Sequence, residues 1–162
     1  MQKSTTLSLT FSFRLPERTA VSVVLLSFAL LLAGCGQPPA PAKPVDIAKD
    51  DICARCRQPI TDIQYAAEFI TKDGFVRKFD DMGCMLEHAR KLTPGKIAAF
   101  FAMDYDRKVW MKAEEAVYVR SERFKTPNDG GILAFASKER AQSLASQYEA
   151  EVLDFSSLLR LD

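Results

Sequence analysis

Apolar and polar positions from residue 51 onward follow the spacing of short strands and amphipathic helices. Three runs rich in β-branched and aromatic residues have the length of strands, and they cover residues 63–71, 75–79 and 97–105. Between the second and third runs, apolar positions recur at helical spacing over residues 82–91, and Asp80 or Asp81 stands where an N-cap is expected. Turn residues at 72–74 join the first two strands into a hairpin. This part of the chain therefore predicts the order strand, strand, helix, strand.

The second part of the chain repeats this order. Strand patterns occupy residues 116–120, 132–136 and 151–155, and a helical pattern over 137–148 begins at Ser137, a good N-cap. The predicted fold class is α+β, with tandem ββαβ repeats, mainly antiparallel sheets and helices packed on them. We place the first half at residues 51–105 and the second half at residues 106–162.

The N-terminus has the pattern of an export signal. Basic residues precede an apolar run over residues 20–33, which is short for a transmembrane helix and has the length of a signal-peptide core. The run ends in Leu32-Ala33-Gly34-Cys35, which resembles the bacterial lipobox. We therefore predict a signal peptide over residues 1–34, cleavage before Cys35 and lipid on its thiol. The alternative is an uncleaved anchor with a chance cysteine.

Residues 35–50 join this lipid site to the predicted folded part. Prolines at positions 38, 39, 41 and 44 favour extended polyproline II, so we predict a tether. Gly36, and not aspartate, follows the lipid-bearing cysteine, so no signal for retention at the inner membrane is present. We expect a lipid-anchored protein on the periplasmic face of a bacterial membrane, with the outer membrane of a Gram-negative cell as its location.

Composition and charge exclude several classes of function. The net charge is +1, and no stripe of lysine and arginine is present that would neutralise phosphates, so a nucleic-acid partner is not expected. The chain also lacks the GxSxG, phosphate-loop and Rossmann glycine patterns. We therefore do not expect an enzyme.

With Cys35 lipidated, three cysteines remain, and an odd number leaves at least one thiol outside any disulfide. The spacing of Cys53 and Cys56 places two sulfurs close together in a turn. That geometry suits a metal chelate, a redox disulfide or a structural disulfide, and haem attachment is disfavoured because Arg57 stands where that motif needs histidine.

The third thiol, Cys84, lies on the first predicted helix. Helical spacing places Cys84 and His88 together on adjacent turns, away from the apolar stripe, so that thiolate and imidazole can close on one ion. The alternatives are a small buried hydrophobe for Cys84 and a solvated surface side chain for His88. Met85 borders the apolar stripe and is either a core residue or a thioether ligand. The candidate metal ligands are thus Cys53, Cys56, Cys84, His88 and Met85.

Three features together resemble the NosL family of lipoproteins. They are the lipobox with its proline tether, the Cys53-x-x-Cys56 pair, and the run Phe79-Asp80-Asp81-Met82-Gly83-Cys84-Met85. The later pattern of Trp110, Thr126-Pro127, Gly130-Gly131 and Ala134-Phe135 also fits. The resemblance implies Cu(I) binding, a tandem ββαβ fold similar to domains of the organomercurial lyase, and a donor or chaperone role in assembling the copper centres of nitrous oxide reductase in denitrification.

Two positions depart from the family pattern. Gln58 and Asn128 stand where the family tends to have methionine, so two thioether ligands that the resemblance implies are missing. Three hypotheses follow. The first is a Cu(I) metallochaperone whose partners are a cuproenzyme client or a copper transporter or donor, because Cu(I) accepts two or three soft ligands and passes between thiolates by exchange. The second is a scaffold with a structural zinc ion held by three cysteines and His88. The third is a thiol-disulfide enzyme that uses Cys53 and Cys56.

Overall fold

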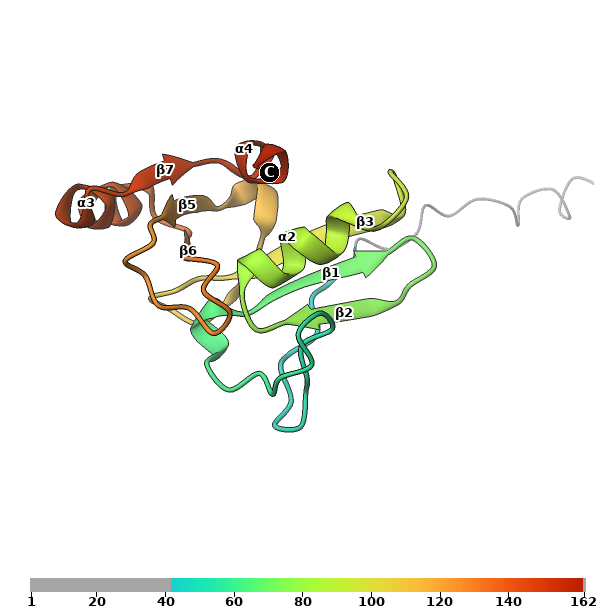
Figure 1. Cartoon of the computed structure of the whole chain (residues 1–162). Coiled ribbons are helices and arrows are strands. Elements are labelled where there is room, and N and C mark those ends of the chain that lie inside the picture. Colours follow the sequence, from blue (N-terminus) through green and yellow to red (C-terminus); the bar gives the residue numbers. More distant parts are fainter. Residues whose placement is uncertain (1–41, 162) are drawn as a thin grey trace, which may run out of the picture. The chain divides into compact units, whose positions relative to one another are not determined.

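The described chain, residues 42–161 of a computed structural model, contains the strand-strand-helix-strand order twice (Figure 1). The first set consists of β1 (Ala67–Thr71), β2 (Val76–Phe79), α2 (Met82–Arg90) and β3 (Ile97–Met103). The second set consists of β5 (Val117–Arg120), β6 (Ile132–Phe135), α3 (Lys138–Tyr148) and β7 (Glu151–Leu153). The predicted α+β fold class with tandem ββαβ repeats is confirmed. The predicted signal peptide, Cys35 and the first part of the tether lie outside the described residues.

Two antiparallel sheets carry these strands. The first sheet has the order β2-β1-β3-β4, in which β4 (Trp110–Lys112) pairs with the end of β3, and the second has the order β6-β5-β7. Helix α2 lies across the first sheet, and α3 lies beside the second (Figure 1). Strand β2 is therefore an edge strand of the first sheet.

Four short elements differ from the prediction. Residues 63–65, predicted as strand, form a 3₁₀ helix, η1 (Ile63–Tyr65), and a second one, η2 (Ala113–Glu115), follows β4. The last strand ends at Leu153 because the carboxylate of Asp154 accepts a hydrogen bond from the Ser157 N–H over 2.7 Å. This cap begins α4 (Phe155–Arg160), which the sequence analysis did not predict. Strand β4 was also missed, because three residues are too few to show an alternating pattern.

The two halves share one hydrophobic core. Phe69 and Phe79 of the first sheet pack against Met82 and Met85 on the inner face of α2. The same cluster extends into the second half through these buried residues: Tyr118, Ile132, Ala134, Phe155 and Leu158. A smaller cluster lies between the second sheet and α3. The shared core fixes the loops of the second half against the N-terminus of α2.

The chain before β1 packs on the first sheet from Val45 onward. The Val45 N–H donates to the carboxylate of Glu68 over 3.1 Å, and the ammonium of Lys78 donates to the Asp46 carbonyl over 2.6 Å. Contacts with the sheet thus begin within the stretch predicted as tether. Over residues 42–161, no helix combines the length and the hydrophobicity needed to cross a membrane.

Candidate metal centre

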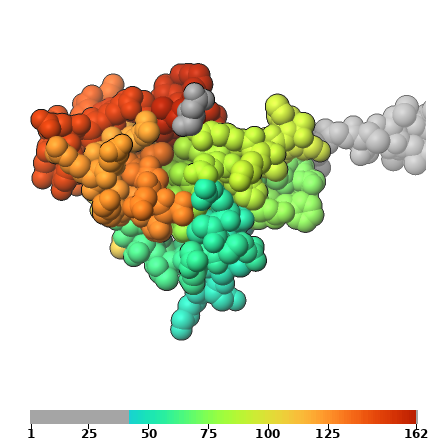
Figure 2. All heavy atoms as spheres, in the orientation of Figure 1, coloured from blue at the N-terminus to red at the C-terminus, as the bar shows by residue number. Residues whose placement is uncertain are grey.

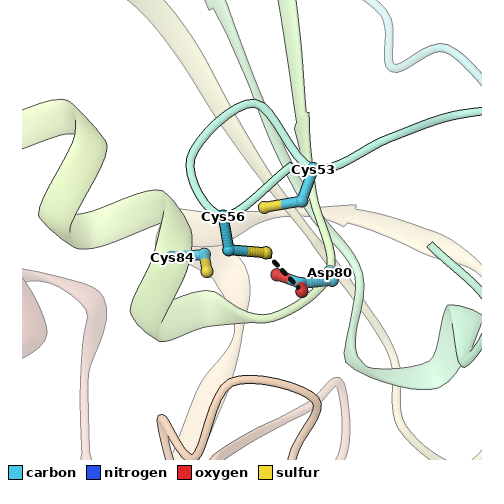
Figure 3. Close-up of side chains that lie close together, drawn as sticks. All are labelled: Cys53, Cys56, Asp80 and Cys84. Atoms are coloured by element: carbon cyan, nitrogen blue, oxygen red, sulfur yellow. Dashed lines mark hydrogen bonds between the residues drawn. The ribbon is translucent and has the colours of Figure 1, made fainter. Parts of the chain in front are cut away.

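Three thiols and one carboxylate meet where β2 runs into α2 (Figure 3). They belong to Cys53, Cys56, Asp80 and Cys84, and the ligand atoms all lie within 4.8 Å of one another. All three cysteines are free thiols. The structure therefore brings together the predicted Cys53/Cys56 pair and the distant Cys84. Figure 2 shows the segment before β1, in teal, as a lobe against the yellow-green residues of α2.

A tight loop presents the first two thiols. Ile52 and Pro59 form an antiparallel bridge across its base, and the Cys53 N–H donates to the Gln58 carbonyl over 2.8 Å. The Arg57 N–H closes the turn on the Cys53 carbonyl over 3.1 Å. Arg57 has a φ of 67°, in the left-handed region that favours glycine. The loop is thus held in one conformation by its own backbone.

The loop is docked on the end of β2. The Ala54 N–H donates to the Lys78 carbonyl over 2.8 Å, and the Cys56 thiol donates to Oδ2 of Asp80 over 3.0 Å. Oδ1 of Asp80 is buried and has no hydrogen-bond partner among residues 42–161. A buried carboxylate oxygen without a partner is destabilising, and a cation bound among these groups would satisfy it. The donor set therefore fits a bound metal ion.

Asp80 is a site residue that the sequence analysis missed, because it treated Asp80 and Asp81 together as candidates for the helix N-cap. Asp81 takes that role, and the carboxylate of Asp80 faces the thiols. The pair of aspartates carried a usable signal. Only one residue can cap a helix, so the second aspartate, four residues before Cys84, was a candidate for another role.

Asp81 fixes the position of Cys84. Its Oδ1 accepts the Cys84 N–H over 2.8 Å. Its Oδ2 accepts the Thr126 hydroxyl over 2.8 Å and the backbone N–H groups of Asn128 (3.1 Å) and Gly130 (3.3 Å). One buried carboxylate thus joins the helix that carries the third thiol to a loop of the second half.

Hydrogen bonds among these groups divide the thiols by acidity. The hydrogen bond from the Cys84 thiol lowers the pKa of Cys53 to about 6, against the opposing effect of burial. The same interaction raises the pKa of Cys84 far above its usual range. Burial and the hydrogen bond to Asp80 raise the pKa of Cys56 to about 11. Cys53 is therefore the most acidic of the three thiols, and a cation that bound all three would displace protons from Cys56 and Cys84.

The arginine inside the Cys53/Cys56 loop is a second residue that the sequence analysis missed. Nη1 of Arg55 lies 3.8 Å from Sγ of Cys84, and Nη2 pairs with the carboxylate of Glu87 on α2. No sequence pattern pointed to Arg55, because its partners belong to a helix outside the motif. It places a positive charge beside the thiols.

His88 does not belong to this group of ligand atoms in the described structure. Its ring packs against Phe69 and Phe79, with ring centroids 5.7 and 5.4 Å apart. Burial, with the nearby charges of Arg77 and Lys91, lowers the pKa of His88. A residue four positions further along a helix is rotated by about 40°, and the two aromatic rings hold the imidazole on that side. Sequence spacing therefore brought His88 near Cys84 without bringing it into the site.

The remaining candidates are placed as follows. Cys84 is wholly buried although it lies off the apolar stripe, because the Cys53/Cys56 loop covers that side of α2. Met85 is also wholly buried and packs in the core. The Gln58 side chain is exposed on the loop, and Asn128 lies on the loop bound to Asp81. Cys35 lies outside the described residues.

Fold and site together define a small α+β protein with a thiol-rich candidate metal centre. The NosL family model matches residues 44–160, so the chain belongs to the NosL family, and the resemblance seen in the sequence is confirmed. The crystal structure of the copper chaperone NosL from Shewanella denitrificans has a similar fold, with a TM-score of 0.65 and 18% identity over 75% of this chain and 98% of that chain. Comparison with curated protein sequences gave no match.

Proposed function

We propose that this protein is a Cu(I)-binding accessory protein that holds copper for the assembly of a cuproenzyme. The observation that carries the proposal is the meeting of three thiols and Asp80 within 4.8 Å. Thiolates are soft ligands, and two or three of them suffice for Cu(I), which passes between proteins by exchange of thiolates. The Shewanella denitrificans protein of similar fold is described as a copper chaperone, which supports this choice of metal.

The client that fits this proposal is nitrous oxide reductase or a similar cuproenzyme, and a copper transporter or donor would load the site. The protein has no catalytic role of its own in this proposal. It acts at the periplasmic face of a bacterial membrane, most simply the outer membrane, held there by lipid on Cys35. A Cys35→Ser variant should bind the same amount of metal and leave the membrane fraction. If this variant stayed in the membrane fraction, another anchor would be required.

Asp80 favours structural zinc as a second candidate. Zinc prefers four ligands in a tetrahedron and readily takes a carboxylate oxygen, so Cys53, Cys56, Cys84 and Asp80 would supply a closed site. In that case the metal would stay bound and the protein would act as a scaffold. The two candidate functions therefore differ in how much the affinity for the metal ion depends on Asp80.

Titration of the anaerobic protein with Cu(I) and Zn²⁺ separates these functions. We expect one Cu(I) per chain, with affinity reduced more than about tenfold by Cys56→Ser, since each lost thiolate removes a strong soft ligand. Asp80→Asn should leave Cu(I) affinity nearly unchanged and weaken zinc binding. His88→Gln is the matched control on α2 and should affect neither metal. Zinc that Cu(I) cannot displace, and that depends on Asp80, would support the scaffold instead.

A further inference from the structure

A cleft of about 550 Å³ lies along the outer edge of β2, beside the loop that carries Cys53 and Cys56. We call it the β2 cleft. Its lining includes Ile52 and Arg57 from the loop, Val76, Arg77 and Lys78 from β2, and His88 from α2. The segments that supply the thiols, the loop and α2, thus also form walls of this cleft. A molecule seated here would lie next to the candidate metal centre.

The β2 cleft is positively charged. Arg57, Arg77 and Lys78 line it, and its acidic lining residue, Asp51, is already paired with the ammonium of Lys78 at 2.6 Å. Within residues 42–161, neither Arg57 nor Arg77 has a carboxylate within ion-pair distance. The excess charge therefore faces the solvent of the cleft and favours an anionic occupant.

Arg57 is not at this position for the stability of the loop. A non-glycine residue in the left-handed region costs roughly 1 kcal/mol, and the φ of Arg57 is 67°. Its side chain is exposed and makes no ion pair within the described chain. A strained, exposed and unpaired arginine at the mouth of a cleft indicates a role in binding.

Two backbone N–H groups of β2 face the cleft. In the β1–β2 hairpin, Phe69 pairs with Arg77, and the Thr71 N–H donates to the Phe75 carbonyl. Because hydrogen-bonded pairs alternate along an antiparallel ladder, the peptide groups of the residues between them, Val76 and Lys78, face outward. Their carbonyls already accept hydrogen bonds, from the Arg77 guanidinium over 3.1 Å and from the Ala54 N–H over 2.8 Å. The outward N–H groups of Val76 and Lys78 are left to donate to the carbonyls of an extended segment laid along this edge.

Apolar groups complete the cleft. Ile52 is 43% exposed and Val45 is 45% exposed, and both line the cleft beside the basic side chains. An extended chain directs successive side chains to opposite faces, so one with alternating acidic and apolar residues would meet both kinds of group. Charge and strand geometry thus specify the same type of occupant.

We propose that the β2 cleft binds an extended acidic segment of a partner protein, which adds to the edge of β2 next to the thiols. The inference deepens the proposed function, on which it rests for the nature of the partner, a protein that exchanges metal with this site. The docking itself needs no metal, so it is tested on metal-free protein. If the peptide does not bind, the proposal of Cu(I) binding is unaffected. If Cu(I) does not bind, the proposal that the β2 cleft binds an acidic segment is unaffected.

The test uses the full-length protein in nanodiscs of zwitterionic phosphatidylcholine. A labelled peptide of alternating glutamate and valine is titrated by fluorescence anisotropy, with a lysine–valine peptide as the charge-reversed control. We expect only the acidic peptide to bind, and we expect it to slow hydrogen exchange at the amides of Val76 and Lys78. Equal binding of the two peptides, or protection elsewhere on the chain, would overturn the proposal.

Two variants sharpen this test. Arg57→Gly should weaken peptide binding about fivefold through loss of one charge contact. Its folded state should not suffer, because glycine suits the backbone at this position. Arg123→Gln, a similarly exposed arginine in the second half, should bind the peptide normally. An Arg57→Gly variant that bound like the parent would contradict the proposal. A second result would also contradict it: no binding of the acidic peptide, together with slower hydrogen exchange at Val76 and Lys78 when phosphatidylglycerol replaces phosphatidylcholine. That result would indicate that this surface binds the membrane.

Discussion

Arg55 and Glu87 form an ion pair across the rim of the candidate metal centre. Arg55 stands between the two cysteines of the loop, and Glu87 lies one turn after Cys84 on α2, so the pair ties together the two segments that supply thiols. The guanidinium also lies 3.8 Å from Sγ of Cys84. Three thiolates, a carboxylate and one Cu(I) would form a strongly negative group. Arg55 is placed to offset part of that charge.

Replacing Arg55 with glutamine should therefore weaken Cu(I) binding. Glutamine removes the charge and adds no soft ligand for copper; since Arg55 and Glu87 are partly exposed, we expect a loss of about fivefold in affinity. Competition with a chromophoric Cu(I) chelator measures the change. Arg123→Gln, at an arginine remote from the thiols, serves as the control. Unchanged affinity in Arg55→Gln would mean that the ion pair only fastens the loop, which a lower melting temperature would then show.

The buried carboxylate of Asp81 should contribute strongly to stability. It accepts four hydrogen bonds from two segments. In Asp81→Asn, an NH₂ group replaces one carboxylate oxygen, and this group cannot accept a hydrogen bond from the donors that surround it. We expect a loss of about 3 kcal/mol in the free energy of unfolding, measured by chemical denaturation. Thr126→Val removes one of these bonds and the acceptor of the Gly131 N–H, and should cost less, about 2 kcal/mol. If the two variants were equally stable, the network would not act as a unit centred on Asp81.

The sequence predicted most of the elements because their patterns are local. Helix α3 begins after Ser137, as its cap indicated, and α2 begins after Asp81, one of the two expected caps. The sequence of residues 63–65 predicts the start of a strand, because its apolar content continues into β1, whereas the structure has a 3₁₀ turn there. Local composition does not distinguish a tight turn from an extended segment when both precede a buried strand.

The three thiols of the candidate site were predictable from the sequence, and its charged residues were not. Cys53, Cys56 and Cys84 carry the chemistry in their residue type, whereas Asp80 and Arg55 acquire their roles from contacts across 24 and 29 residues of sequence. His88 is the reverse case. Helical spacing favoured a contact with Cys84, and packing against two phenylalanine rings turned the imidazole elsewhere. Tertiary packing determines the contacts of Asp80 and Arg55 and also those of His88. Local patterns in a single sequence do not reveal such contacts.

Gly83 is required by a close approach between the two halves. A Cβ at this position would lie 2.9 Å from Cα of Gly130, a backbone atom that cannot move aside easily. Replacing glycine by alanine within a helix normally stabilises it by about 1 kcal/mol. In Gly83→Ala we expect the opposite sign, a loss of about 2 kcal/mol, because the contact must open. Thermal denaturation decides the sign, and a raised melting temperature would show that the loop around Gly130 moves freely.

Glu68 is a wholly buried carboxylate under the start of the described chain. The Val45 N–H lies 3.1 and 3.3 Å from its two oxygens. Burial raises the pKa of Glu68 from 4.5 to about 7, although this hydrogen bond and the charge of Lys78 oppose the shift. The folded state therefore holds a proton that the unfolded chain releases between about pH 4.5 and 7.

The contribution of Glu68 to the free energy of unfolding should consequently fall as the pH rises from 4.5 to 7. The contribution of Glu68 is fully present below this range and lost above it. Glu68→Gln keeps an oxygen for the Val45 N–H and cannot ionise, so above pH 7 this variant should be more stable than the parent by on the order of 2 kcal/mol. Chemical denaturation at pH 5 and pH 8 measures the difference, with Glu122→Gln as an exposed control. A parent and variant that changed equally between the two pH values would exclude Glu68 as the titrating group.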